Sequence, residues 1–295
     1  MSTNIHAEQK PLIYQIGKHV KLVDDATFCK SIIADGKELF TGEEYGAIRV
    51  LELKDEKVYI TFKEDLTSLA NAFSGCSALK SIPENLFANC PKATDFSFTF
   101  FGCKALTAIP EGLFANNPKV TIFQGTFSYC SALKSLPANL FANNRKVNSF
   151  RLTFSGCSAL KSIPENLFAN CPKVNSSFQT FALCKSLKSI PTGLFAHNPE
   201  VTDFSGTFSG CSALESISEK LFANNTKVTN FSYTFKNCSA LIGESPYTMI
   251  DGQKVHLYER ADYPEHFTTP TSTYQAFGNC TGLTDYAQIP SDWKE

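Results

Sequence analysis

Cysteine is the residue type here with the most evident capacity for chemistry, since thiols form disulfides and bind zinc. The 295-residue chain has 11 cysteines. Seven of them recur every 27 residues: Cys76, Cys103, Cys130, Cys157, Cys184, Cys211 and Cys238. No Cys-x-x-Cys pair or Cys/His cluster supplies the spacing of zinc ligands. Disulfides between stacked coils are sterically conceivable, but the spacing favours a buried column of reduced thiols, with no metal and no cofactor.

A second group of reactive side chains lies near the C-terminal end. It consists of His256, Glu259, Arg260, Asp262 and His266, beside several aromatic residues. These residues could form an acid–base or metal site, but their spacing matches no known ligand motif. A solvated loop with ion pairs accounts for them equally well. Because the chain offers neither a paired nucleophile and base nor a metal set, we expect no enzyme.

Composition limits the possible partners. The net charge is −1, which gives no overall field for nucleic acid or an anionic membrane. No apolar run is long enough to cross a bilayer, so no membrane insertion is expected. The first ten residues, MSTNIHAEQK, do not read as a signal peptide. The expectation is a cytoplasmic protein, or a surface or secreted one whose leader lies outside this sequence.

A repeat positions these residues. From Phe73 to Leu241 the chain follows F-x-x-C-x-x-L-x-x-I-P-x-x-L-F-A-N-N/C-P-K-V-T-x-F-x-x-T, with a period of 27 residues. A fixed period of this size is typical of a solenoid, in which each coil buries its apolar side against the next. The L-x-x-I segments, closed by proline, predict short strands stacked into a parallel sheet about 4.8 Å per coil. Each coil also divides into two similar halves, which predicts opposite walls.

One column of the repeat contains only asparagine and cysteine. Its members are Cys90, Asn117, Asn144, Cys171, Asn198 and Asn225. A buried turn leaves backbone groups that need partners, and both residue types can donate a hydrogen bond. The Asn/Cys alternation is typical of leucine-rich repeats. The sequence therefore predicts a hydrogen-bonding ladder along the stack.

Two segments resemble a known family. Residues 201–217, VTDFSGTFSGCSALESI, and residues 158–174, SALKSIPENLFANCPKV, look like the BspA-like leucine-rich repeats of bacterial surface proteins. The resemblance covers roughly residues 68 to 290. It implies a right-handed α/β leucine-rich-repeat solenoid with 27-residue coils and a role in adhesion and host-protein binding. It transfers no catalytic residue.

The flanking segments depart from the repeat. Residues 1–66 are expected to be a β-rich cap or docking segment, with a hairpin at Asp35-Gly36 and a second pair of strands, IRVLEL and KVYITF, within residues 48–62. Residues 67–241 are the solenoid. Residues 242–295 combine an insertion, a last partial repeat and a C-terminal cap, with a hairpin around Asp251-Gly252. The insertion is either part of that cap or a functional loop.

Three sets of residues are candidates for ligand contact. The first is a column of lysines beside the predicted strands: Lys80, Lys134, Lys161 and Lys188. The second comes from the two positions that vary most between copies: Phe98, Gln124, Arg151, Phe178, Gln179 and Tyr233. The third lies in the insertion: Tyr258 and Arg260. Exposed aromatic and arginine side chains are common contact residues.

These features predict a non-enzymatic binding or adhesion protein, displayed on a bacterial surface if it is exported. Its ligand would be a protein, possibly a host extracellular protein, or a glycan, and not a nucleic acid. The alternative is a structural or assembly protein, inside the cell or in a phage tail-type particle, that uses the solenoid as a scaffold and residues 1–66 for docking. Solubilising lysines and a relaxed solvent turn explain the same residues without any ligand.

Overall fold

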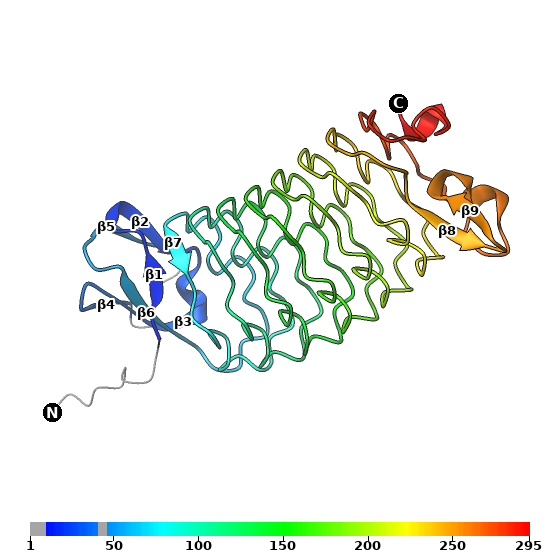
Figure 1. Ribbon diagram of the computed structural model, residues 1–295. Helices are drawn as coiled ribbons and strands as arrows, with labels where there is room; N and C mark the ends of the chain where they lie inside the picture. Colours follow the sequence, from blue (N-terminus) through cyan, green and yellow to red (C-terminus); the bar gives the residue numbers. More distant parts are fainter. Residues whose placement is uncertain (1–9, 41–45) are drawn as a thin grey trace.

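The computed structural model describes residues 10–40 and 46–295. Residues 1–9 and 41–45, which belong to the predicted segment 1–66, lie outside the described residues. Figure 1 shows a row of stacked loops with a β-rich module at the N-terminal end and a small hairpin near the C-terminal end. No helix among the described residues is long and apolar enough to cross a membrane.

Within residues 10–40 and 46–62, the N-terminal module contains six strands and one 3-10 helix. The elements are β1 (Leu12–Tyr14), β2 (Gly17–Val23), η1 (Ala26–Phe28), β3 (Cys29–Ala34), β4 (Lys37–Phe40), β5 (Ile48–Leu53) and β6 (Lys57–Phe62). β3 and β4 form the hairpin predicted at Asp35-Gly36. The second predicted hairpin is wrong in its pairing, although both of its strands exist. β6 buries Val58 and Phe62 and lies between β1 and β3, whereas the more exposed β5 pairs with β2 in a separate ribbon.

The module is joined to the first coil through its backbone. β1 pairs antiparallel with β7 (Leu79–Ser81), which belongs to the first coil, so the five-stranded sheet has the order β4-β3-β6-β1-β7. The Phe62 ring packs 5.5 Å from Phe87 and 6.1 Å from Phe73, measured between ring centroids. Strand pairing and aromatic packing therefore cover the apolar end of the stack, which a solenoid needs for stability.

Successive coils are joined by parallel bridges between residues 27 positions apart. The chain of bridges runs Ser68, Asp95, Ile122, Ser149, Ser176, Asp203 and Asn230, and then reaches Ser272. These residues lie in the V-T-x-F segments, so the predicted location of the stacked strands in L-x-x-I is largely wrong. The L-x-x-I wall has few bridges, such as Ser189 to Ser216. Proline follows five of these segments, though not the one that ends at Ile217, and removes a backbone donor there.

The α component of the predicted α/β class is also wrong for the described residues. Residues 10–40 and 46–295 contain 3-10 helices and turns, but no α-helix. The corners of each coil use hydrogen bonds between residues three apart, as in Cys76 N to Phe73 O at 3.0 Å and Cys90 N to Phe87 O at 2.9 Å. Each corner turns the chain within a few residues, which leaves no room for a longer helix.

Three columns of stacked phenylalanines fill the interior; the one through Phe123 and Phe150 is interrupted at Ser177. In one column the Phe100 and Phe127 rings are 5.4 Å apart and inclined by 6°. In another the Phe114 and Phe141 rings are 6.3 Å apart and also inclined by 6°. All four side chains are buried. Removing one such ring typically costs about 3–5 kcal/mol, so these columns account for a large part of the stability.

Buried polar side chains form ladders beside the aromatic columns. Each repeat cysteine from Cys103 on donates its thiol hydrogen to a phenylalanine carbonyl of the preceding coil, as in Cys130 Sγ to Phe100 O at 3.1 Å. Burial raises the pKa of the Cys157 thiol to about 12, which keeps this donor protonated. All eleven cysteines are free. The regular cysteine spacing thus corresponds to a column of hydrogen-bond donors.

The Asn/Cys column forms a second ladder. Asn144 Nδ2 donates to Asn117 O at 2.9 Å and to Phe114 O at 3.4 Å, and Cys171 Sγ donates to Asn144 O at 3.5 Å. The side-chain oxygens of the four ladder asparagines have no hydrogen-bond partner in the described chain. The ladder uses only the donor of each side chain. A single thiol hydrogen can therefore stand where an amide usually does.

A third ladder consists of threonines. Thr126 Oγ1, for example, donates to Phe96 O of the preceding coil and to Phe123 O of its own coil, both at 2.9 Å. Threonine appeared in the repeat pattern without a role. Its hydroxyl satisfies backbone carbonyls that the short bridges leave without partners.

The insertion ends the Asn/Cys ladder. It consists of β8 (Tyr247–Ile250), β9 (Gln253–His256), which pair around Asp251-Gly252 as predicted, and η2 (Leu257–Asp262). Arg260 donates to Phe222 O at 2.8 Å and to Asn225 O at 2.9 Å, the two acceptors that an asparagine of a further coil would use. The cysteine ladder instead continues, with Cys280 Sγ 3.0 Å from Phe235 O. After η3 (Ser291–Trp293), Trp293 packs 6.1 Å from Phe277.

Candidate binding surface

One corner of each coil differs between copies. We call it the outer corner; it comprises residues 97–102 and their equivalents in the other coils. Two residues per coil have positive φ there. The first column is Asn71, Phe98, Gly125, Leu152, Gln179, Gly206, Tyr233 and Gln275. The second column is Gly75, Gly102, Tyr129, Gly156, Leu183, Gly210, Asn237 and Asn279. A left-handed backbone costs a non-glycine residue roughly 1–2 kcal/mol, so large side chains at these positions are notable.

Glycines in these columns make room for large side chains of the preceding coil. A Cβ atom on Gly125 would lie 2.4 Å from the Phe98 ring, and one on Gly156 would lie 2.7 Å from the Tyr129 ring. Leu183 blocks Gly210 in the same way, at 2.7 Å. The large side chains therefore lean across the next coil. The alternation of large residue and glycine has a steric cause.

Phe98, Phe101 and Tyr129 form a contiguous group, which we call the aromatic cluster. The rings of Phe98 and Phe101 are 6.0 Å apart, and those of Phe101 and Tyr129 are 5.5 Å apart, both edge to face. Tyr129 is 47% exposed, and both phenylalanines are partly exposed. Gly125 and Gly156 have no side chains that could cover the neighbouring Phe98 and Tyr129 rings. The cluster is an open aromatic platform.

Further along the outer corner lie two smaller groups. The Arg151 guanidinium stacks 3.9 Å from the centre of the Phe178 ring. Tyr233 packs edge to face against Tyr274 at 5.4 Å, with the Lys236 ammonium 4.9 Å from the Tyr233 ring centre. Gln124 and Gln179 are partly exposed on the same corner. The candidate variable positions thus lie on one continuous edge of the solenoid.

Sequence reasoning missed several residues of this edge: Phe101, Tyr129, Leu183, Lys236 and Tyr274. The sequence does indicate two of these residues, Tyr129 and Leu183, because the residue before each repeat cysteine is usually glycine or asparagine. Tyr129 and Leu183 interrupt that column. Large residues at a position that otherwise favours glycine indicate a selected side chain.

A basic wall adjoins the outer corner. The lysine wall consists of Lys104, Lys134, Lys161, Lys185 and Lys188, all exposed. The coil segments that carry these lysines, residues 104–108, 131–135, 158–162 and 185–189, contain no acidic residue. Lys188 pairs with Glu215 at 3.3 Å, and the candidate Lys80, in the first coil, pairs with Glu56 at 3.8 Å. The first four lysines of the wall make no ion pair within the described chain.

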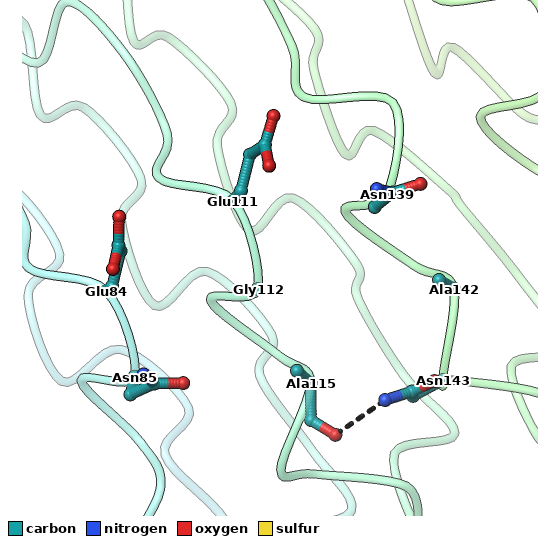
Figure 2. A pocket seen from close by; sticks show the side chains of 8 residues that line it. All are labelled: Glu84, Asn85, Glu111, Gly112, Ala115, Asn139, Ala142 and Asn143. Carbon is teal, nitrogen blue, oxygen red and sulfur yellow. Dashed lines mark hydrogen bonds between the residues drawn. The ribbon is translucent and has the colours of Figure 1, made fainter.

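The opposite corner carries a shallow polar groove of about 470 Å³, lined by residues of three coils. Figure 2 shows Glu84 and Glu111 on one side and Asn139 and Asn143 on the other. Asn143 Nδ2 donates to Ala115 O at 3.0 Å, so this amide is used within the scaffold. Gly112, Ala115 and Ala142 are small, and they leave the groove open along the stack.

The candidate residues of the insertion lie in a network that ties the hairpin to the last coil. His256 contacts Glu259 through Nδ1 at 3.0 Å and Glu244 through Nε2 at 3.1 Å. Asp285 accepts hydrogen bonds from Ser245 Oγ at 2.5 Å and from the Tyr258 hydroxyl at 3.4 Å. Burial and the nearby Asp285 carboxylate raise the pKa of Tyr258 well above its ordinary value. Ser245 donates to Asp285 and not to the imidazole. The network holds the hairpin of β8 and β9 against the last coil.

Arg260 is wrong as a candidate ligand-binding residue. Its side chain is 1% exposed and donates to two backbone carbonyls of the last complete coil. Its guanidinium also lies 4.4 Å from the centre of the Phe267 ring. Burial lowers the pKa of Arg260 to about 9. The charge that suggested a ligand site from sequence instead closes the interior ladder.

The stacked coils, the aromatic interior and the asparagine ladder define a leucine-rich-repeat solenoid. The family model described as the BspA type leucine rich repeat region matches six copies within residues 56–229. The chain belongs to this family. No curated protein matches the chain.

Solved structures with leucine-rich repeats are similar to parts of the chain. The APL1 leucine-rich repeat domain is 17% identical over 48% of this chain, with a TM-score of 0.33. The Toll–Spatzle complex of Drosophila is 18% identical over 70%, with a TM-score of 0.30. A leucine-rich repeat protein from Bacteroides ovatus is 20% identical over 66% of this chain and 73% of its own, with a TM-score of 0.24. The matches span 38% of the APL1 chain and 29% of the Toll-complex chain.

Proposed function

We propose that this protein is a non-enzymatic binding module that acts in adhesion from a bacterial surface. Its ligand, a protein or a glycan, docks on the outer corner. One observation carries the proposal: the copies differ most where large aromatic and arginine side chains stand exposed, while the interior columns are nearly constant. Membership of the BspA-type family supports a binding role. A rigid surface with exposed aromatic anchors favours specific binding at a low entropic cost.

The backbone under this surface is held in place from coil to coil. Phe98 N donates to Gln124 O, and Phe100 N donates to Thr126 O, both at 2.8 Å. Alternate residues around the corner repeat this pattern, and the residues between them bond within their own coil. The contact side chains therefore stand on a preorganised support.

The test is a binding screen against immobilised extracellular-matrix proteins and glycans. A quadruple variant, Phe98→Gly, Arg151→Ser, Phe178→Ser and Tyr233→Gly, uses residues that other coils have at the same positions, so the fold should persist. A matched control, Asn89→His, Asn116→His and Asn170→His, places the residue of the equivalent His197 on the opposite corner. We expect the quadruple variant to lose any ligand that the control keeps. Equal binding by both variants would refute the proposal.

Display on the cell surface is tested separately. Protease treatment of intact cells should remove the protein if it is displayed, whereas a cytoplasmic protein would survive until the cells are lysed. The readout is the full-length chain on a blot, with a cytoplasmic enzyme as the control.

The second candidate is a scaffold in a larger assembly that docks through the N-terminal module. One observation favours it: Leu51, on β5 of the ribbon formed by β2 and β5, is 80% exposed, and Ile16, just before β2, is 60% exposed. Exposed apolar residues on a sheet favour contact with another surface. Leu51→Glu should then release the protein from its assembly in gel filtration of cell extracts and leave ligand binding at the outer corner unchanged.

A further inference from the structure

The lysine wall and the aromatic cluster lie side by side on neighbouring coils. We infer that together they bind a linear acidic polysaccharide, with sugar rings on the aromatic cluster and carboxylate or sulfate groups on the lysines. The inference rests on the proposed function and names the class of ligand.

Charge is the first argument. Lys134 and Lys161 stand on adjacent coils, where Lys161 N donates to Lys134 O at 3.3 Å. Like charges on neighbouring strands repel, so this arrangement does not serve stability. Neither lysine has an ion-pair partner in the described chain, whereas Lys80 and Lys188, on coils at either end of the same column, do. The centre of the row therefore presents cations that only an external anion can neutralise.

The aromatic cluster is the second argument. Lys104 lies three positions after Phe101, and Lys134 lies five positions after Tyr129, so the aromatic cluster and the lysine wall meet at the turn around each cysteine. That turn is tight, with Lys104 N donating to Gly102 O at 2.8 Å. Aromatic rings offer a flat apolar face to the C–H face of a pyranose, and the Tyr129 hydroxyl adds a polar contact at the rim.

The spacing of the coils is the third argument. Neighbouring backbones in such a stack are about 4.8 Å apart. A pyranose unit in an extended, linear polysaccharide advances by a comparable distance. Each coil can therefore present one cation to one sugar unit, so that an acidic polymer lying along the solenoid meets Lys104, Lys134 and Lys161 in turn.

The rings favour a polysaccharide over single-stranded nucleic acid. Bases bind to successive, separated ring faces on which they can stack. In the aromatic cluster the rings meet edge to face at 6.0 and 5.5 Å, which fills the space between them and leaves one joint platform. The near-neutral chain, with its net charge of −1, also gives little long-range attraction for nucleic acid.

The experiment measures binding of polygalacturonate and heparin at low and high salt by calorimetry. Lys134→Gln with Lys161→Gln should weaken binding roughly tenfold at low salt and flatten its salt dependence. Phe98→Gly with Tyr129→Gly should weaken binding by about tenfold at both salt concentrations. The two probes distinguish a carboxylate polymer from a sulfated one. Uncharged dextran and an oligothymidylate are the comparison ligands.

The matched control is Lys119→Gln with Lys146→Gln. These two lysines are exposed and occupy another column on adjacent coils, away from the lysine wall and the aromatic cluster. Replacing them removes the same charge as replacing Lys134 and Lys161. Equal losses in both lysine pairs would show diffuse attraction and overturn the inference. Tighter binding of the oligothymidylate than of either polysaccharide would overturn it as well. If no acidic polysaccharide binds while the outer-corner variant still loses a protein ligand, the inference fails and the proposed function stands.

Discussion

The two halves of each coil share an interior and differ on the outside. In both halves a phenylalanine carbonyl accepts a hydrogen bond from the next coil, from cysteine in one half and from the Asn/Cys column in the other. The outer corner of the cysteine half has two residues with positive φ in every coil, whereas at the corresponding corner of the asparagine half only Asn85 and Gly112 have positive φ in the described chain. A uniform interior therefore supports one plain corner and one variable corner.

The two halves also end differently. The cysteine ladder continues into the last partial repeat through Cys280. The Asn/Cys ladder stops at Asn225, and Arg260 of the insertion takes the next position. In both ladders the buried carbonyls of the last coil keep a hydrogen-bond donor, the Cys280 thiol in one and the Arg260 guanidinium in the other.

Alkaline pH should produce the largest difference between the halves, because the cysteine half has a buried thiol in every coil, whereas the Asn/Cys column has only Cys90 and Cys171. Burial raises the pKa of Cys157 and Cys211 from 9.0 to about 12. The folded chain then holds protons that the unfolded chain has lost, so stability is fully present below pH 9 and falls as pH rises towards 12. Within that window, each such thiol lowers the free energy of unfolding by about 1.4 kcal/mol per pH unit.

Chemical denaturation between pH 8 and pH 11 measures this effect. A Cys157→Ser, Cys211→Ser variant keeps two donors that do not titrate, and its stability should fall less steeply. An unchanged slope in the serine variant would remove the distinction between the halves.

Arg260→Leu tests the end of the Asn/Cys ladder. It leaves the carbonyls of Phe222 and Asn225 without their donors and should cost about 2–4 kcal/mol, because each unsatisfied buried group costs about 1–3 kcal/mol. The measurement is the free energy of unfolding in urea. Hydrogen exchange should locate the loss in the last coils, and uniform loss along the array would contradict the assigned role.

Asn144→Leu tests the middle of the same ladder. The amide donates to Phe114 O and Asn117 O, so its removal should cost roughly 1–3 kcal/mol. Asn144→Cys is the control, because Cys171 occupies the equivalent position with a donor in place. We expect the cysteine variant to lose less than about 1 kcal/mol. Equal losses would mean that shape and not hydrogen bonding governs this column.

Gly125→Ala tests the outer corner and should have the smallest effect. The added Cβ meets the Phe98 ring at 2.4 Å and sits at a positive φ, so about 1–2 kcal/mol should be lost. In a Phe98→Gly background the steric part of that loss should disappear. A double-mutant cycle measures the coupling between the two positions, and its absence would contradict the steric account.

Much of the interior could be predicted from sequence, because fixed columns of cysteine, asparagine and leucine report directly on stacking. The wall that carries the bridges could not, since L-x-x-I and V-T-x-F have similar apolar spacing and only the three-dimensional turn decides which one pairs. The same limit applies to β5, whose partner β2 lies far away in sequence.

The binding surface was predicted in part. The variation between copies indicated the positions of Phe98, Arg151 and Tyr233, but not the contacts that Phe101 and Tyr129 make across coils. Arg260 was misread because a charged residue near aromatics looks the same in sequence whether it meets solvent or backbone carbonyls. Burial distinguishes the two cases, and burial is a property of the folded chain.

Arg260 has a consequence for how this protein could lengthen or shorten. Its guanidinium recognises two carbonyls that every complete coil provides, and nothing in that contact depends on how many coils come before. Deleting or duplicating a 27-residue unit upstream would present the same pair of acceptors to the same side chain. The number of coils, and with it the reach of the molecule, can change by recombination between near-identical units without a new terminus having to arise.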